Sequence, residues 1–229
     1  MESRLWGGAV RCLFQEIFLP RTALTSVEFY TRRLPHCHPP DSEFFITWRL
    51  HGSLPKPADN TAPKPQSFGE AFVALDRRLD CAATGPLWLK NPQVAEKVSG
   101  VLLSGMSEWA WYELTAWVVM ANHIHVLLRP QVPLRKALMN IKSASARAAN
   151  AALQRSGKPF WQDESYDHWV RGDRERSQII RYIHNNAVNA GLVSEPERWP
   201  WSSAGWRRTA PPHTGLPRNS NPNSPRVNT

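Results

Sequence analysis

Residues 111–129 read WYELTAWVVMANHIHVLLR, and this stretch is the most informative part of the chain about its architecture. Residues 111–120 and 123–129 have the branched and aromatic content of β-strands, and only Ala121 and Asn122 lie between them. Two strands joined by so short a connection must be antiparallel. The stretch therefore predicts two neighbouring strands of an antiparallel sheet.

Further strands and helices are expected on both sides of this pair. The strand candidates are residues 44–50 and 160–170, the second of which could also be an extended loop, and the helix candidates are residues 68–80, 91–104, 134–151 and 174–190. Asn91 is expected to cap the second helix and Asp173 the last one, which Gly191 ends. This order predicts an α+β fold, a ferredoxin-like antiparallel sheet with helices packed on one face.

Two of the helix candidates carry apolar side chains at helical spacing. In the first, this stripe consists of Leu134, Ala137, Leu138, Ile141, Ala144, Ala148 and Ala151. In the second, it consists of Ile179, Ile180, Ile183 and Ala187. Both faces are expected to be buried. The first helix also carries basic residues on exposed faces, where they could contact DNA or simply be solvated: Arg135, Lys136, Lys142 and Arg147.

The chain of 229 residues is long enough for one sizeable core. We expect a single domain at residues 34–208, preceded by an N-terminal extension at residues 1–33 that has no secretory pattern and could be mobile. Residues 209–229 are rich in Pro, Asn, Ser and Arg and are expected to form a disordered tail. Residues 56–66 contain several prolines and are expected to form a loop.

Basic residues outnumber acidic ones by 28 to 19, which gives a net charge of +9. Most of the basic residues are arginines, whose planar side chain makes bidentate contacts with phosphate. Nucleic acid is therefore the expected partner. A basic membrane-binding protein is the competing interpretation, but no segment combines a lysine-rich face with a strongly apolar one, and no apolar run approaches about 18 residues.

The three cysteines, Cys12, Cys37 and Cys81, are odd in number and widely spaced. This usage indicates a reducing compartment, and we expect a soluble cytoplasmic protein. His36, Cys37 and His38 together have the composition of a small metal cluster, but no second pair of ligands follows at zinc-finger spacing.

His123 and His125 are separated by one residue within the second predicted strand of the opening stretch. Because strand side chains alternate between faces, both imidazoles point the same way and can clamp a metal ion. Ile124, Val126 and Leu128 then point the other way and pack beneath the helices. An isolated pair of this kind is more often two ordinary hydrogen-bonded histidines.

Tyr182 and Asn186 lie one turn apart in the last predicted helix, beside its apolar stripe. Positions i and i+4 share a helix face, so a phenol nucleophile and a third metal ligand could meet the histidines together. The alternative is a boundary tyrosine and an ordinary polar residue. Two neutral imidazoles and a neutral amide would leave nearly the full double charge of a metal ion facing a phosphate.

Several motifs occur in order along the chain, at residues 45–55, 118–128, 160–168, 180–193 and 199–203. With this spacing they resemble the REP-associated tyrosine transposases, within the HUH superfamily of single-strand DNA nucleases, over about residues 33–207. The chain departs from the usual pattern of that family at Ala121 and Ala187, where proline is common.

The resemblance implies a metal-dependent enzyme that cleaves and rejoins single-stranded DNA at hairpins. His123 and His125 would bind the metal, Mg²⁺ or Mn²⁺, together with Asn186. Tyr182 would be the nucleophile and would form a 5′-phosphotyrosine. Apart from the resemblance, the basic charge suggests that Arg181 contacts DNA with the basic residues of the long helix. A nearby cation or Arg181 would help to lower the pKa of the tyrosine from its reference value of about 10.

Two other functions stay open at this point. One is a DNA-binding regulator on the same fold whose catalysis is vestigial. The other is a zinc hydrolase in which His168 or His184 joins the two strand histidines, although no HExxH helix is present. The chain also lacks a glycine-rich phosphate loop, so no nucleotide cofactor is expected. The sequence does not decide between a monomer and a homodimer.

Overall fold

The computed structural model describes residues 28–31, 35–54, 74, 76–80 and 85–206. The predicted loop, the predicted C-terminal tail and most of the predicted N-terminal extension lie outside these residues. Four residues of that extension are described. They form strand β1 (Glu28–Thr31), which pairs with β2 (Pro35–His38) in a separate two-stranded sheet.

The central sheet consists of four antiparallel strands in the order β4-β5-β3-β6. Their bounds are Phe44–Arg49 for β3, Tyr112–Val119 for β4, His123–Pro130 for β5 and Tyr166–Trp169 for β6. The antiparallel pair predicted from residues 111–129 is therefore confirmed. Strand β6 occupies only the end of the predicted segment 160–170, and Trp161 near its beginning makes an isolated bridge to Leu50.

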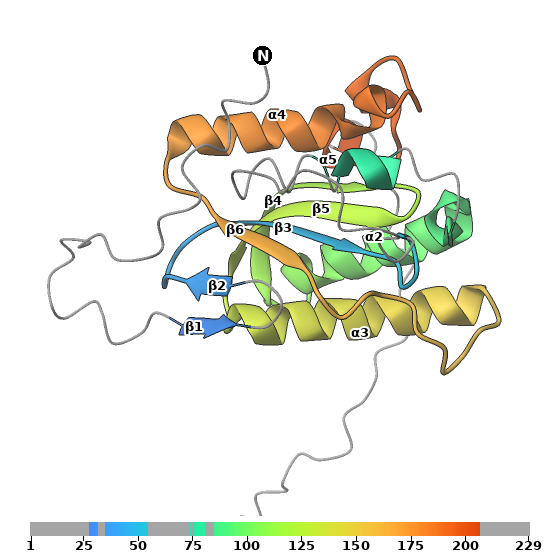
Figure 1. Ribbon diagram of the computed structural model, residues 1–229, viewed down its shortest axis with the longest axis horizontal. Coiled ribbons are helices and arrows are strands. Elements are labelled where there is room, and N and C mark those ends of the chain that lie inside the picture. Colours follow the sequence, from blue (N-terminus) through green and yellow to red (C-terminus); the bar gives the residue numbers. More distant parts are fainter. Residues whose placement is uncertain (1–27, 32–34, 55–73, 75, 81–84, 207–229) are drawn as a thin grey trace, which may run out of the picture.

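Three long helices of the described chain surround this sheet (Figure 1). Helices α2 (Pro92–Ser107) and α3 (Leu134–Ala152) pack together on one face, and α4 (Asp173–Asn189) lies on the other. Shorter helical turns are η2 (Trp88–Lys90), η3 (Pro196–Arg198) and α5 (Ser203–Trp206). Within the described ranges, none of the helices has both the length and the apolar character needed to cross a membrane.

The element order β3-α2-β4-β5-α3-β6 confirms the predicted α+β fold, with α2 and α3 on one face as a ferredoxin-like sheet requires. The prediction put all helices on that face, however, and α4 covers the opposite one. The reason is that the opposite face is also apolar. Phe45, Val118 and Leu127 are buried there against Ile179 and Ile183 of α4, and an apolar sheet face must pack against another element.

Strand β5 is buried on both of its faces. Ile124, Val126 and Leu128 belong to the core beneath α2 and α3, as the alternation predicts. His123 and His125 alternate with them and therefore point to the α4 face. The orientation of the strand thus directs both imidazoles toward the helix that carries Tyr182 and Asn186.

The buried face of α3 differs from the predicted stripe in its second half. The buried residues are Leu134, Ala137, Leu138, Ile141, Ser145, Ala149 and Asn150. Ala144, Ala148 and Ala151 were predicted in the stripe but are partly or fully exposed. The predicted stripe repeats every 3.5 residues, whereas a straight helix has 3.6 residues per turn, so the stripe drifts by about 20° per heptad. The buried face follows the straight helix instead.

The helix caps agree with the sequence at α2 and differ from it at α4. The Asn91 side chain caps α2 and accepts a hydrogen bond from the backbone N–H of Gln93 at 3.0 Å. The N-cap of α4 is Gly172, which makes no side-chain cap hydrogen bond, and not Asp173. Asp173 is already the first helical residue, where its negative charge interacts favourably with the helix dipole. Gly191 follows α4 with φ of 70°, the left-handed conformation in which helices commonly end.

Candidate active site

Two imidazoles converge on one point at the α4 face of the sheet. His123 and His125 are buried, with 1% and 0% of their surface exposed, and their Nε2 atoms lie 3.1 Å apart. Two nitrogens at this distance share at most one proton. At least one lone pair is therefore available to a bound cation.

Hydrogen bonds behind each ring fix the orientation of both histidines. His123 Nδ1 lies 2.7 Å from Asn122 Oδ1, and His125 Nδ1 lies 2.7 Å from Thr47 Oγ1. An amide oxygen only accepts, so Nδ1 of His123 is the donor and Nε2 keeps its lone pair. The Asn122 amide is itself held, because its Nδ2 donates to the carbonyl of Leu79 at 2.9 Å. Bonds of this kind orient metal-binding histidines in proteins.

A carboxylate joins the two imidazoles. Asp76 Oδ1 lies 3.1 Å from His125 Nε2 and 3.5 Å from His123 Nε2, and only 4% of Asp76 is exposed. The three ligand atoms all lie within 4.8 Å of one another. Among the described residues, this is the one group of three His, Cys, Asp or Glu side chains that could hold a metal ion.

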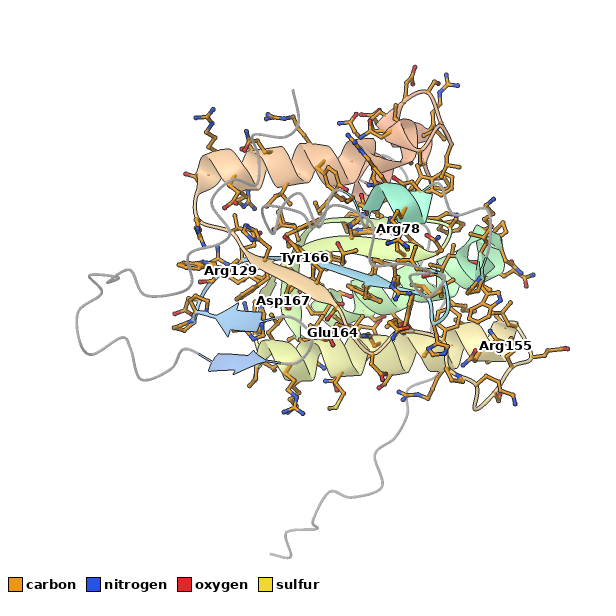
Figure 2. All side chains as sticks on the ribbon, in the orientation of Figure 1. Arg78, Arg129, Arg155, Glu164, Tyr166 and Asp167 are labelled. Atoms are coloured by element: carbon orange, nitrogen blue, oxygen red, sulfur yellow. The ribbon has the colours of Figure 1, made fainter. Side chains whose placement is uncertain are left out.

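Asp76 belongs to a helical segment, residues 76–80, on the same side of the sheet as α4. Figure 2 shows Arg78 of this segment on the α4 side, whereas Arg155, just beyond α3, lies on the other side. Asp76 was not among the predicted site residues. It stands four residues before Asp80 in a predicted helix, so the two carboxylates share one helix face, and this pair was the available signal in the sequence.

Helix α4 brings the predicted nucleophile and the predicted amide to the same point. The Tyr182 hydroxyl donates a hydrogen bond to Asp76 Oδ2, and the centroid of its ring lies 5.6 Å from that of His125. Asn186, of which 1% is exposed, donates from Nδ2 to the same Asp76 oxygen at 3.4 Å. The structure therefore places together the four residues predicted for catalysis and metal binding.

Burial and mutual interaction set the charges of this group. Burial, reinforced by the nearby His125, lowers the pKa of His123 to about 3, so this imidazole is neutral at neutral pH. Burial opposes the ionisation of Asp76, but the attraction of the two histidines outweighs it and lowers the pKa of this carboxyl. Burial, and next the charge of Asp76, raise the pKa of Asp80 to about 7. A neutral imidazole and an ionised carboxylate are the forms that bind metals.

The residues present fit a divalent metal ion. An octahedral ion with bonds of about 2.1 Å keeps neighbouring ligand atoms roughly 3.0 Å apart. The three ligand atoms of Asp76, His123 and His125 are separated by 3.1, 3.1 and 3.5 Å. Asn186 Oδ1 offers a further oxygen, because it is buried and has no hydrogen-bond partner among the described residues. The nitrogen donors favour Mn²⁺ over Mg²⁺.

The predicted DNA contacts fall on two sides of the molecule. Arg181 is exposed on α4, directly before the predicted nucleophile. Three exposed residues lie on α3, across the sheet from the histidines: Arg135, Lys136 and Arg147. Lys142 instead contacts protein, with Nζ at 2.6 Å from the carbonyl of Gln162 and 2.8 Å from that of Asp163. Of the predicted DNA contacts, only Arg181 shares an element with the site.

The histidines considered as alternative zinc ligands are held elsewhere. His168 Nε2 lies 2.8 Å from Glu175 Oε1, and His184 Nε2 lies 2.9 Å from the hydroxyl of the first residue of α5. Neither belongs to the group formed by the two strand histidines. His38, which belongs to the His-Cys-His sequence considered above, pairs with Asp167 at 2.9 Å. Among the described residues, no third histidine therefore joins His123 and His125, as the zinc hydrolase considered from the sequence would require.

Comparison with known proteins tests the resemblance to the REP-associated tyrosine transposases. Residues 88–186 match the family model described as Transposase IS200 like. The matched segment begins at η2 and ends at Asn186, so it includes both strand histidines and Tyr182. The predicted resemblance to this class is confirmed for that segment.

Two curated proteins are similar to part of the chain. The REP-associated tyrosine transposase of Escherichia coli (strain K12) is 26% identical over 95 residues, which make up 40% of this chain and 54% of that protein. A relative from Haemophilus influenzae is 27% identical over 105 residues, 40% of this chain and 58% of its own. The chain thus spans little more than half the length of these relatives. The solved structure of a REP-associated tyrosine transposase bound to a REP hairpin is 18% identical, with a TM-score of 0.45, over 76% of this chain and 81% of that one.

Proposed function

We propose that the protein is a metal-dependent transposase-type enzyme that cleaves and rejoins single-stranded DNA, at hairpins formed by repetitive extragenic palindromes. One observation carries this proposal. The hydroxyl of Tyr182, the imidazoles of β5 and the amide of Asn186 converge on Asp76, although they come from elements far apart in the chain. A nucleophile beside a metal-ligand group is what covalent cleavage of a phosphodiester requires.

His123, His125 and Asn186 would hold a divalent metal ion, Mg²⁺ or Mn²⁺. When bound, the ion would polarise an oxygen of the scissile phosphate and stabilise the charge that develops there. Two features of these residues favour binding of this ion. His123 is neutral at neutral pH and need not lose a proton to become a ligand, and Asn186 Oδ1 has no hydrogen bond to give up within the described residues.

Tyr182 is the nucleophile in this proposal. Its oxygen forms a bond to phosphorus while the bond from phosphorus to the 3′ oxygen breaks. The phenolic proton passes to solvent, and the leaving oxygen takes a proton from solvent to become a free 3′-hydroxyl. The resulting 5′-phosphotyrosine conserves the energy of the phosphodiester, so a second 3′-hydroxyl can reverse the step and join strands without a nucleotide cofactor.

The charge of the protein supports a DNA substrate. The net charge is +9, and Arg181 is exposed beside the nucleophile, where it can hold the strand that is cut. The exposed basic residues of α3 lie across the sheet and would contact a part of the hairpin away from the cut, whereas Lys142 already binds protein carbonyls. We further propose that the protein is cytoplasmic and acts as a monomer or a homodimer.

The proposal is tested with labelled single-stranded hairpin DNA from the genomic neighbourhood of the gene, incubated with the protein in the presence or absence of Mn²⁺ or Mg²⁺. A denaturing gel then compares the unmodified protein with Tyr182→Phe and His123→Ala. We expect a covalent protein–DNA band that requires metal, is absent in Tyr182→Phe and is strongly reduced in His123→Ala.

Two outcomes would contradict this proposal. A covalent adduct that persists in Tyr182→Phe would show that another residue is the nucleophile. Hairpin binding without an adduct from the unmodified protein, under any metal condition, would support the alternative of a DNA-binding protein whose catalysis is vestigial.

A further inference from the structure

Asp76 makes different contacts with its two carboxylate oxygens. Oδ1 faces the imidazoles, at 3.1 Å from His125 Nε2 and 3.5 Å from His123 Nε2. Oδ2 faces α4, where it accepts hydrogen bonds from the Tyr182 hydroxyl and from Asn186 Nδ2. One side chain thus stands between the metal-ligand atoms and the nucleophile.

We propose that Asp76 is a bridging carboxylate, whose Oδ1 is a ligand of the metal ion and whose Oδ2 holds the hydroxyl of Tyr182 in place. This inference rests on the proposed function and adds a residue to it. Asp76 is then a fourth metal ligand and, for the chemical step, a positioning residue that acts through Tyr182.

The burial of Asp76 argues for the metal contact. A carboxylate that is only 4% exposed is strongly disfavoured unless a positive charge compensates it. Its partners among the described residues are two imidazoles, a phenol and an amide, and no lysine or arginine is paired with it there. A divalent cation beside Oδ1 would supply that charge. The separations of Oδ1 from the two Nε2 atoms match those of ligands on one ion.

The packing of Tyr182 argues for the second contact. Its ring meets Phe45 edge-on at a centroid distance of 6.0 Å and His125 at 5.6 Å, so aromatic neighbours fix the position of the ring. The hydrogen bond to Asp76 then fixes the direction of the hydroxyl. The nucleophile is therefore oriented by the same carboxylate that faces the metal ligands.

The segment that carries Asp76 is attached to the histidine strand. The backbone carbonyl of Leu79 accepts a hydrogen bond from Asn122 Nδ2 at 2.9 Å. The Oδ1 atom of the same Asn122 side chain accepts a hydrogen bond from His123 Nδ1. This connection keeps the segment above the imidazoles. The segment that carries Asp76 is thus linked through Asn122 to His123, one of the metal ligands that Asp76 would join.

Metal binding tests the first half of this inference without any need for activity. Titration calorimetry with Mn²⁺ on the full chain compares the unmodified protein with Asp76→Asn, with Asp76→Glu and with Glu113→Gln. Glu113 is exposed at the far end of β4, so its substitution removes one negative charge away from the site. We expect Asp76→Asn to weaken Mn²⁺ binding by at least about tenfold and Glu113→Gln to leave it unchanged. An affinity for Asp76→Asn within about twofold of the unmodified protein would overturn the inference.

The second half is tested by the rate of adduct formation at Mn²⁺ concentrations that saturate each variant. We expect Asp76→Asn to remain at least about tenfold slower than the unmodified protein in a single turnover. We also expect Tyr182→Phe to keep its Mn²⁺ affinity, because the phenol contacts Oδ2 and not the ion. Full recovery of the Asp76→Asn rate by metal would overturn the bridging role.

Two controls keep the outcomes distinct. If thermal unfolding shows that Asp76→Asn is not folded, Asp76→Glu replaces it: this variant keeps the charge but displaces both oxygens, so it should bind Mn²⁺ and still react slowly, and a normal rate would contradict the inference. If the unmodified protein binds no Mn²⁺ or forms no adduct, the proposed function itself fails. If the unmodified protein binds Mn²⁺ and forms the adduct, the results for the Asp76 variants test only the role of Asp76 and not the proposed function.

Discussion

Substitution of Asn122 by alanine should destabilise the fold and weaken metal binding together. Asn122 is 1% exposed, and its amide bonds to His123 Nδ1 at 2.7 Å and to the carbonyl of Leu79 at 2.9 Å. Alanine leaves both groups buried without a partner, and each unsatisfied group costs about 1–3 kcal/mol. The free energy of unfolding should therefore fall by roughly 2–6 kcal/mol, a large part of the 5–15 kcal/mol typical of a domain.

The effect on metal binding follows from the same contacts. Without Asn122, nothing fixes the ring orientation of His123 through Nδ1, and loss of such a partner typically lowers metal affinity by about 10–100-fold. Urea unfolding followed by tryptophan fluorescence measures the first effect, and Mn²⁺ calorimetry measures the second. Asn185→Ala is the matched control. Among the described residues, the Asn185 amide donates only to the carbonyl of Arg181, in an exposed hydrogen bond within α4, so its loss should change stability by no more than about 0.5 kcal/mol. Equal stability and equal Mn²⁺ affinity of the two variants would refute this reasoning.

Three further predictions concern separate parts of the structure. Burial opposes ionisation of Glu175, but hydrogen bonds from His168 and the backbone of Arg171 outweigh it and lower the pKa of Glu175 from the usual 4.5. Glu175→Gln should therefore be destabilising above pH 4.5, and its effect should shrink as the pH falls through the lowered pKa. Urea unfolding between pH 7 and pH 3 measures this. Gly105→Ala should lower stability by about 1–3 kcal/mol in the same assay, because an added Cβ would overlap the buried Tyr112 ring, whereas an unchanged midpoint would show that α2 can move aside. Mn²⁺ at about a hundredfold excess over its Kd should stabilise the protein by about 2.7 kcal/mol in thermal unfolding, and the same shift in His125→Ala would contradict the assigned site.

The sequence predicted those parts of the site that depend on local geometry. One intervening residue gives His123 and His125 a common direction as soon as a strand forms, and one helical turn does the same for Tyr182 and Asn186. The apolar residues that alternate with the histidines also determine which face of the sheet the imidazoles occupy. Each of these features depends only on neighbours in the chain.

Asp76 could not be predicted in this way, because its place depends on a tertiary contact. The segment 76–80 meets the sheet where Asn122 binds the carbonyl of Leu79, and no periodic pattern shows that a given helix will meet a given strand. The position of α4 had the same limit. The apolar stripe of α4 was predicted, but the side of the sheet that α4 covers was not. The helix lies on the histidine face because that face is also apolar, and the sequence of β5, which carries two histidines on that face, does not indicate this.

Asp76 changes the electrostatic argument that the sequence suggested. Neutral ligands alone would leave a divalent ion with nearly its full charge, whereas an ionised Asp76 lowers the net charge of the loaded site from about +2 to about +1 and roughly halves its attraction for a phosphate at a given distance. A metal-saturated Asp76→Asn variant therefore attracts the phosphate more strongly than the unmodified protein does. If that variant still reacts more slowly, the loss cannot come from weaker electrostatic attraction, and it must come from the nucleophile that Asp76 no longer holds. The rate at saturating Mn²⁺ thus separates the two roles that the structure joins in one carboxylate.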